Sequence, residues 1–318
     1  MNKITVLGSM NMDIVYKIKE APKDGETIFG TNLEYICGGK GANQAVAASR
    51  LGSKVSMIGR IGADANGKIL VEALKNDGIN TSFVFEDVTE NSGTAIISVN
   101  EIGSNSIVVI SGSNMKISNS DVLKATDEIK KSCFIVAQLE VPIPAIEFAF
   151  DLANKNGVKT VLNPAPALEI SDEIYSKTDI IIPNETETFE LTGIKVTDEK
   201  SATDAAKFFF RKGVGHVIIT MGEKGAALIS KEKTVLIPAN NVKAVDTTAA
   251  GDGFVGALVS YLCRKNDKQH NEQGRVTLNF EALEKAVKFA NKVSSLVVQR
   301  NGAQPSLPYL REIEENYE

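Results

Sequence analysis

The sequence predicts an α/β fold in which a doubly wound, mostly parallel sheet is flanked by helices and carries a small β-sheet lid. Short β-branched runs alternate with amphipathic stretches along the chain, a pattern typical of buried parallel strands joined by helices. Two pairs of further strands interrupt that alternation. We expect all 318 residues to form one domain (1–318), with the lid strands inserted at about 14–35 and 94–110.

The predicted strands of the main sheet are short and apolar: residues 4–7, 55–58, 134–137, 160–162, 180–182 and 217–220. Apolar residues recur at helical spacing between them, as at 69–74 and 146–153. Gly78 and Gly157 follow these two stretches, where glycine can take the left-handed conformation that ends a helix. Strands that alternate with helices favour a doubly wound sheet.

The lid is predicted from two hairpins. Residues 14–18 and 27–35 flank a turn-rich segment at 21–25, and residues 94–100 and 106–110 flank another turn at 101–105. These four strands could cover the mouth of the larger sheet. The alternative is that they extend the edge of the main sheet. A polar stretch at 264–274 predicts a surface loop.

The composition excludes several classes of protein. Lys and Arg total 35 and Asp and Glu total 40, for a net charge of −5, so no basic face for a nucleic acid is expected. No apolar run approaches the roughly 20 residues that span a bilayer, and the first residues become polar too soon for a signal peptide. We therefore expect a cytoplasmic protein without membrane contact. Three widely spaced cysteines predict reduced thiols, and two histidines exclude a multi-histidine metal centre.

Two glycine motifs imitate nucleotide-binding loops. Residues 62–68 fit the first seven positions of a P-loop, but Ile69 stands where a hydroxyl must hold magnesium, so a simple loop and helix start is favoured. The glycines of 251–256 match the dinucleotide pattern G-x-G-x-x-G and follow a predicted strand at 242–245. No second strand with an acidic ribose ligand follows, which argues against that interpretation.

The same glycines fit an anion hole better. A helix is expected to begin near Gly251, so that its first amides point into the turn of Ala249 and Ala250. Small residues let a phosphate approach the backbone, and the positive end of the helix stabilises charge on a transferring phosphoryl group. Asp252 lies beside this turn, where a carboxylate can accept a hydroxyl proton. The alternative for Asp252 is a helix N-cap.

Polar residues near two other strand ends predict a ligand site. Lys40 and Asn43, within the glycine run 38–44, offer donors to an oxygen-rich ligand. Asn11 and Asp13 follow the first strand and Glu140 follows the strand at 134–137, at the edge where open α/β sheets bind ligands. Asp13 could accept hydrogen bonds from two neighbouring sugar hydroxyls. Each carboxylate taken alone fits a solvated loop charge as well.

Together these motifs resemble the PfkB family of carbohydrate kinases, and its ribose-phosphorylating members in particular. The resemblance covers nearly the whole chain and rests on GSMNMD (8–13), GGKGANQA (38–45), NPAPA (163–167), PNETE (183–187), AAGD (249–252) and GAQPS (302–306). It implies a Rossmann-like core, a homodimer formed through the lid, and transfer of a phosphoryl group from ATP to O5 of D-ribose. Another sugar or nucleoside kinase of the family, such as a deoxyribokinase or a fructokinase, is the alternative.

The resemblance also implies roles for individual residues. Asp252 would be the general base, with Ala249, Ala250 and Gly251 forming the anion hole. The sugar would be bound by Asn11, Met12, Asp13, Gly39, Lys40, Gly41, Ala42, Asn43, Glu140 and Asp252. The nucleotide would be bound by Asn184, Thr220, Met221, Gly222, Glu223, Lys224, Gly225, Gly251, Asp252 and Asn291. Glu187 would hold Mg²⁺ through water, and K⁺ would be bound by Asp246, Thr248, Val297, Arg300, Gly302 and Ser306.

Overall fold

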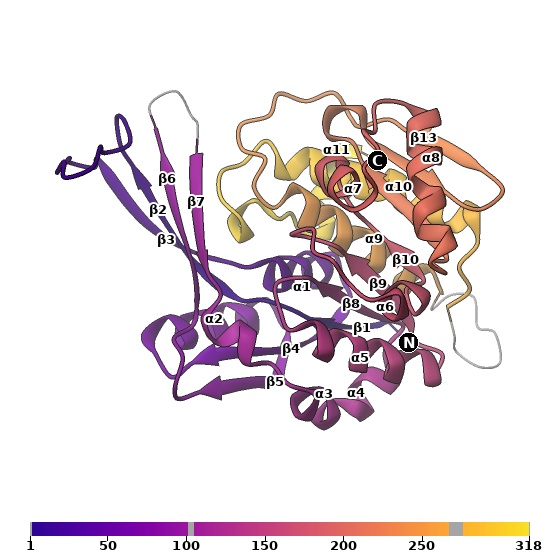
Figure 1. Ribbon diagram of the computed structural model, residues 1–318, viewed down its shortest axis with the longest axis horizontal. Coiled ribbons are helices and arrows are strands. Elements are labelled where there is room, and N and C mark those ends of the chain that lie inside the picture. Colours follow the sequence, from indigo (N-terminus) through magenta and orange to yellow (C-terminus); the bar gives the residue numbers. More distant parts are fainter. Residues whose placement is uncertain (1, 101–104, 267–275, 318) are drawn as a thin grey trace.

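The computed structural model describes residues 2–100, 105–266 and 276–317. Its central feature is a nine-stranded sheet, which extends from β5 at the bottom of Figure 1 to β13 at the upper right. In spatial order the strands are β13 (Thr234–Ile237), β12 (Ala226–Ile229), β11 (His216–Thr220), β10 (Ile180–Ile181), β9 (Lys159–Asn163), β8 (Phe134–Gln138), β1 (Lys3–Leu7), β4 (Lys54–Gly62) and β5 (Asn80–Asp87). Only β12 runs opposite to the other strands, so the predicted mostly parallel sheet is confirmed.

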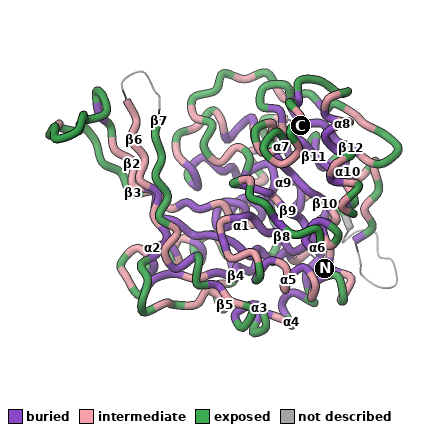
Figure 2. Tube along the Cα trace, in the orientation of Figure 1, coloured by how far each residue is buried: buried purple, intermediate pink, exposed green. Residues whose placement is uncertain are grey.

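Helices cover both faces of this sheet. One apolar cluster packs beneath α1 (Lys40–Arg50), α2 (Ala65–Asn76), α9 (Ala250–Asn266), α10 (Phe280–Val297) and α11 (Leu310–Tyr317). A second packs beneath α3 (Asn119–Lys124), α4 (Thr126–Lys130), α5 (Ile143–Lys155), α6 (Asp172–Ser176), α7 (Glu185–Thr192) and α8 (Glu199–Arg211). Phe134 enters the first cluster and Ile135 the second, because successive side chains of a strand point to opposite faces. Figure 2 shows the resulting buried interior along the central strands and the inner faces of the helices.

The helix ends follow the local sequence. Asp64 caps α2, its carboxylate accepting from the amide of Gly67 at 2.7 Å. Gly78 and Gly157 have φ angles of 72° and 69°, so both take the predicted left-handed conformation after their helices. The carboxylate of Asp64 also accepts from the amide and hydroxyl of Ser92, both at 2.7 Å. The glycine run at 62–68 is therefore a loop and a capped helix start.

A second, four-stranded sheet projects from one end of the main body (Figure 1), and we call it the lid sheet. Its order is β3 (Asn32–Gly38), β2 (Asn11–Lys17), β6 (Gly93–Val99) and β7 (Asn105–Ile110). The two predicted hairpins are antiparallel, as expected, and β2 pairs in parallel with β6 to join them. The lid strands are thus separate from the main sheet and do not extend its edge.

The strand predicted before α9 is absent from the structure. Residues 242–245 form no strand; the amides of Val245 and Asp246 both donate to the carbonyl of Val298, without the paired neighbour that a strand requires. The glycines of 251–256 therefore lack the strand of a dinucleotide-binding motif. Most of the predicted turn at 101–105 and most of the predicted loop at 264–274 lie outside the described residues. Within the described ranges, none of the helices has the length and apolar character to span a membrane.

Candidate active site

A cleft lies where β9, β10 and β11 end and α9 begins. Parallel strands place their carboxyl ends at one edge of the sheet, so the residues that follow them meet there. The cleft is lined by Lys40, Asn163, Ala165, Ile182, Asn184, Glu187, Thr220, Thr247, Ala249, Gly251, Asp252 and Val255. Residues predicted for the sugar, the nucleotide, magnesium and catalysis are therefore neighbours in space.

The start of α9 offers two unpaired backbone amides to this cleft. Ala249 has a left-handed φ of 59°, which turns the chain into the helix. The amide of Ala250 donates to the carbonyl of Thr247 at 3.2 Å, and that of Gly253 donates to Ala249 at 2.8 Å. Among the described residues, the amides of Gly251 and Asp252 have no acceptor in the chain. Nothing lies within 4 Å of the position that a Cβ on Gly251 would occupy, so an anion can reach this backbone.

The carboxylate of Asp252 is buried beside these amides and is held by two side chains of α1. Asn43 Nδ2 donates to Oδ2 at 2.9 Å, and Gln44 Nε2 donates to Oδ1 at 3.0 Å. Asp252 is the third residue of α9, and its side chain bonds to α1 instead of capping its own helix. The N-cap alternative is therefore wrong. Each carboxylate oxygen keeps a free lone pair for a ligand in the cleft.

Three charged side chains extend the site from Asp252 toward the lid sheet. The pKa of Asp13 is raised to about 7, first by burial and then by the charges of Glu140 and Asp252. Burial alone would lower the pKa of Lys40, but the carboxylates of Asp252 and Glu140 raise it above its ordinary value. Glu140 accepts from the hydroxyl of Ser9, which fixes one of its oxygens. Asp13 belongs to β2, not to a turn after the first strand.

Glycines at the end of β3 make room for this cluster. A Cβ on Gly38 would lie 2.2 Å from Oδ2 of Asp13. Gly39 has a φ of 90° and passes so close to the chain that a Cβ there would lie 2.7 Å from the amide of Asn11. Any side chain at either position would displace β2. These close approaches explain why glycines precede Lys40.

Asn114, which the sequence analysis did not identify, orients the amide of Asn11. Asn114 is buried in η1 (Gly112–Lys116); its Oδ1 accepts from the amide of Met10 at 2.9 Å and its Nδ2 donates to the carbonyl of Met10 at 3.1 Å. The same Nδ2 donates to Oδ1 of Asn11 at 2.8 Å. Because the backbone of Met10 fixes the Asn114 amide, Asn11 must turn its oxygen toward Asn114. Its Nδ2 is then the donor left for a ligand.

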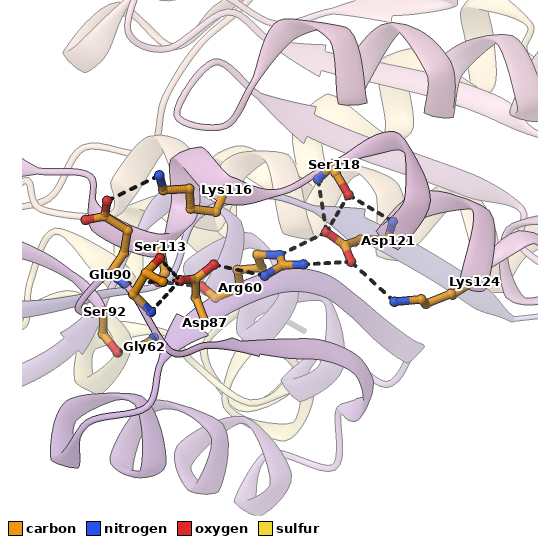
Figure 3. Close-up of polar contacts among 11 residues, drawn as sticks. Arg60, Gly62, Asp87, Glu90, Ser92, Ser113, Lys116, Ser118, Asp121 and Lys124 are labelled. Carbon is orange, nitrogen blue, oxygen red and sulfur yellow. Dashed lines mark hydrogen bonds and ion pairs between the residues drawn. The ribbon is translucent and has the colours of Figure 1, made fainter.

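Hydrogen bonds tie the root of the lid sheet to β4, beside an ion-pair network that joins β4 to β5 and α3 (Figure 3). Arg60 donates from Nε to Asp121 at 2.9 Å and from Nη1 to Asp87 at 3.0 Å. Its carbonyl accepts from the hydroxyl of Ser113, and the amide of Gly62 donates to the hydroxyl of Ser92. These contacts hold both segments that flank the hairpin β6–β7. They also fix the neighbouring Asn114 relative to the main sheet.

Asn184 and Glu187 form the opposite wall of the cleft. They make a capping box at the start of α7, in which each backbone amide donates to the other side chain at 2.8 Å. Burial raises the pKa of Glu187, although the amide of Asn184 and the charge of Lys40 counteract it. One oxygen of Glu187 accepts from that amide, and the other is available for water or a cation.

The oxygen ligands of the cleft fit magnesium that arrives with a nucleotide. Mg²⁺ prefers oxygen ligands, keeps several waters and is usually held by one or two carboxylates together with substrate phosphates. Glu187 and Asp252 supply such carboxylates beside the free amides. In the described part of the chain, no three His, Cys, Asp or Glu side chains are grouped to hold a metal ion by themselves.

The other predicted nucleotide residues are only partly brought to the cleft. Thr220 ends β11 and lines the cleft, and the chain continues through η2 (Gly222–Lys224) to Gly225, whose φ is 97°. Asn291 is buried in α10, and its Nδ2 donates to the carbonyls of Ile237 and Pro238 at 3.1 and 3.0 Å. Its side chain therefore secures the end of β13, and Asn291 is not among the residues that line the cleft.

The predicted potassium residues surround the loop before α9. Oδ1 of Asp246 accepts from the amide and hydroxyl of Thr248 at 2.9 and 2.6 Å, and Oδ2 accepts from the amide of Gly302 at 2.9 Å. These hydrogen bonds outweigh burial and lower the pKa of Asp246, so the carboxylate stays ionised. The guanidinium of Arg300 is paired with Glu312, and Ser306 lies in η3 (Gln304–Ser306). The ligand atoms that this loop offers are oxygens, which suit a hard cation.

Comparison with known proteins agrees with this geometry. Residues 1–310 match the pfkB family carbohydrate kinase pattern. The chain is 43% identical over 313 residues to a ribokinase of Staphylococcus aureus strain COL, covering 98% of both chains. It is 39% identical to a deoxyribokinase of Salmonella typhi, covering 98% of this chain and 97% of the relative. The structure of Arabidopsis thaliana ribokinase complexed with ribose and ATP superposes with a TM-score of 0.87 at 31% identity, covering 99% and 98% of the two chains. The chain therefore belongs to the pfkB family of carbohydrate kinases.

Proposed function

We propose that the protein transfers the γ-phosphoryl group of ATP to O5 of D-ribose, giving ADP and D-ribose 5-phosphate. One juxtaposition carries the proposal: the carboxylate of Asp252 lies beside the amides of Gly251 and Asp252, which have no acceptor among the residues that the structure describes. A proton acceptor and an anion site thus share one cleft. The ribokinase relatives at 43% identity, and the ribose and ATP of the Arabidopsis structure, support ribose as the acceptor.

In this mechanism Asp252 accepts the proton of the 5-hydroxyl as O5 forms its bond to the γ-phosphorus. The bond from that phosphorus to the bridging oxygen breaks, and ADP leaves. Phosphoryl transfer needs alignment and charge neutralisation more than covalent catalysis. The amides of Gly251 and Asp252 would stabilise the charge on the transferring group, and Lys40 adds a positive charge at the same cleft.

The sugar would lie between Asp252 and the lid sheet. Asp13 and Glu140 offer acceptors to its hydroxyls, while Asn11 and Lys40 offer donors. Met12 lies in β2 with Asn11 and Asp13. Gly41, Ala42 and Asn43 lie in α1 with Lys40, and these residues would complete the wall of the sugar site. Covering the sugar with the lid sheet would exclude water, which competes with O5 as the acceptor.

The nucleotide would extend from the anion site along Asn184 and the loop from Thr220 to Gly225. Glu187 would hold Mg²⁺ through water, and the ion would neutralise phosphate charge when bound. Asp246, Thr248, Val297, Arg300, Gly302 and Ser306 would hold K⁺ next to the start of α9. Asn291 would act on the nucleotide by securing the loop after β13.

A deoxyribokinase is the second candidate, because the Salmonella relative with that name is 39% identical over nearly the whole chain. The two substrates differ by the 2-hydroxyl, and a site built to hydrogen-bond a hydroxyl strongly rejects the analogue that lacks it. The deciding experiment measures ADP release with D-ribose, 2-deoxy-D-ribose and D-fructose. We expect the highest kcat/KM with ribose; equal or better use of another sugar would overturn the proposed substrate.

We further propose that the protein works in the cytoplasm as a homodimer formed through the lid sheet. The edge strand β7 exposes four consecutive apolar side chains, from Ile107 to Ile110, and β3 exposes Leu33 and Tyr35. Apolar surface of this extent usually marks an interaction site. Sedimentation analysis should therefore give a dimer for the wild type and a monomer for Val108→Lys. A monomeric wild type would refute the assembly.

A further inference from the structure

We propose that Gln44 is a positioning residue that holds the carboxylate of Asp252 in its reactive orientation through a buried chain of side-chain amides. The inference rests on the proposed function, in which Asp252 is the base. Gln44 belongs to the GGKGANQA run, but no ligand role was predicted for it. Its side chain is 1% exposed and lies between the base and two further amides.

Both N–H donors and the oxygen of the Gln44 amide have a hydrogen-bond partner. Nε2 donates one hydrogen to Oδ1 of Asp252 at 3.0 Å and the other to Oδ1 of Asn163 at 3.0 Å. Oε1 accepts from Nε2 of Gln138 at 2.6 Å. An amide has two donors and one acceptor oxygen, so this arrangement leaves no donor of Gln44 unused.

The chain of side-chain amides also determines that the nitrogen of Gln44, and not its oxygen, faces the carboxylate of Asp252. Asn163 donates from Nδ2 to the carbonyl of Ile182 at 2.8 Å, so its Oδ1 must face Gln44 and accept. Only the nitrogen of Gln44 can satisfy that acceptor. The same nitrogen is therefore presented to Asp252, and a flipped amide would set oxygen against oxygen at both contacts.

The backbone of the main sheet thus sets the orientation of the base. Ile182 follows β10, Asn163 ends β9, Gln138 ends β8, and Gln44 lies in α1. Asn43 holds the other oxygen of Asp252 from the same helix. With one oxygen restrained by each donor, rotation of the carboxylate would break a hydrogen bond, and the free lone pairs stay directed at the sugar and the phosphate.

This arrangement explains two motif residues for which no ligand role was predicted. Asn163 begins the NPAPA run and Gln44 belongs to the GGKGANQA run, and Gln44 connects Asn163 to Asp252 of the AAGD run. A buried polar network of this kind is stabilising when complete and costly when one member is removed. Its catalytic part must therefore be separated from its structural part by experiment.

The test is Gln44→Met, which keeps the length of the side chain and removes its donors. We expect kcat for ribose to fall about 10- to 100-fold, as for a misplaced reactive group, while KM for ribose and for ATP stays nearly unchanged. Gln44→Glu, which keeps the shape and places an acceptor against Asp252, should lose kcat to the same degree. Ser260→Ala is the matched control, because Ser260 makes a buried contact between α9 and the end of α1, away from Asp252.

The three variants distinguish a positioning role for Gln44 from a purely structural one. A kcat loss in both Gln44 variants with nearly unchanged KM, beside a Ser260→Ala enzyme of normal kcat, supports the positioning role. A folded Gln44→Met enzyme with wild-type kcat overturns it, and Gln44→Glu decides in the same way if Gln44→Met does not fold. The wild type in the same assay tests the proposed function: if it phosphorylates a different sugar, that sugar replaces ribose and the Gln44 comparison still holds.

Discussion

Replacing Asp13 by asparagine should make the ligand-free protein more stable at alkaline pH, although it weakens sugar binding. The carboxylate of Asp13 is buried and faces Glu140 and Asp252, and its pKa is raised from 3.8 to about 7. The folded protein therefore binds this proton more tightly than the unfolded chain does. Ionisation of Asp13 therefore lowers the free energy of unfolding, and the protein loses this stability as the pH rises.

The size of the effect follows from the two pKa values. The cost is absent below about pH 4, grows between about pH 4 and 7, and is constant above about pH 7. Each pKa unit corresponds to about 1.4 kcal/mol, so the cost is on the order of 4 kcal/mol at pH 8 and about 2 kcal/mol at pH 5.5. Asparagine has the same shape and no charge. Asp13→Asn should therefore gain about 2 kcal/mol more at pH 8 than at pH 5.5.

Urea unfolding of the ligand-free protein at the two pH values measures this difference. Asp127→Asn, which changes an exposed carboxylate of α4, is the control and should give the same change in unfolding free energy at both. If Asp13→Asn gains no more at pH 8 than at pH 5.5, burial and the neighbouring carboxylates do not disfavour the ionised form of Asp13. The same variant should also bind ribose more weakly, because an amide offers one acceptor oxygen where the carboxylate offers two.

Three further predictions follow from the contacts of the site. Asn114→Leu should raise KM for ribose about tenfold with little change in KM for ATP, because it frees the Asn11 amide to turn; equal effects on both would contradict that role. Arg60→Leu should lower the unfolding free energy by about 1.5–3 kcal/mol, since it removes the guanidinium from the buried carboxylate of Asp121 and leaves Lys124, at 3.8 Å, as the remaining ion-pair partner; a loss below about 1 kcal/mol, typical of an exposed pair, would show that the ion pairs of Arg60 contribute little. Replacing K⁺ with Na⁺ should lower kcat if the oxygen ligands around Asp246 form the cation site, and an enzyme indifferent to the ion would exclude it.

The alternation of strands and helices was enough to predict the main sheet, because parallel strands buried on both faces require continuous apolar runs. The lid hairpins were also predicted, since turn residues separate their strands. The strand expected at 242–245 is absent because β-branched residues alone do not supply a pairing partner: Val245 is 60% exposed, and its amide donates to the carbonyl of Val298, which belongs to no strand. The parallel pairing of β2 with β6 joins segments far apart in the chain, and local patterns contain no signal for it.

The candidate site, like the fold, could be predicted only in part from the sequence. Asp252 and the small residues before it were identified from local chemistry, because small residues at the start of a helix leave its first backbone amides accessible to an anion. Asn114 could not be found in this way, since its partners Met10 and Asn11 are distant in sequence and its own segment has no motif. Gln44 was within a motif, yet its task depends on Asn163, which only the folded chain brings to its amide.

The central claim is that the carboxylate of Asp252 accepts the proton of the sugar hydroxyl, and Asp252→Asn tests it most directly. The variant keeps the shape of the side chain but removes its basicity. Turnover of ribose with magnesium, potassium and ATP should fall about 100-fold or more, while calorimetry should show nearly unchanged affinity for ribose and for the nucleotide. Turnover close to that of the wild type would show that another group takes the proton.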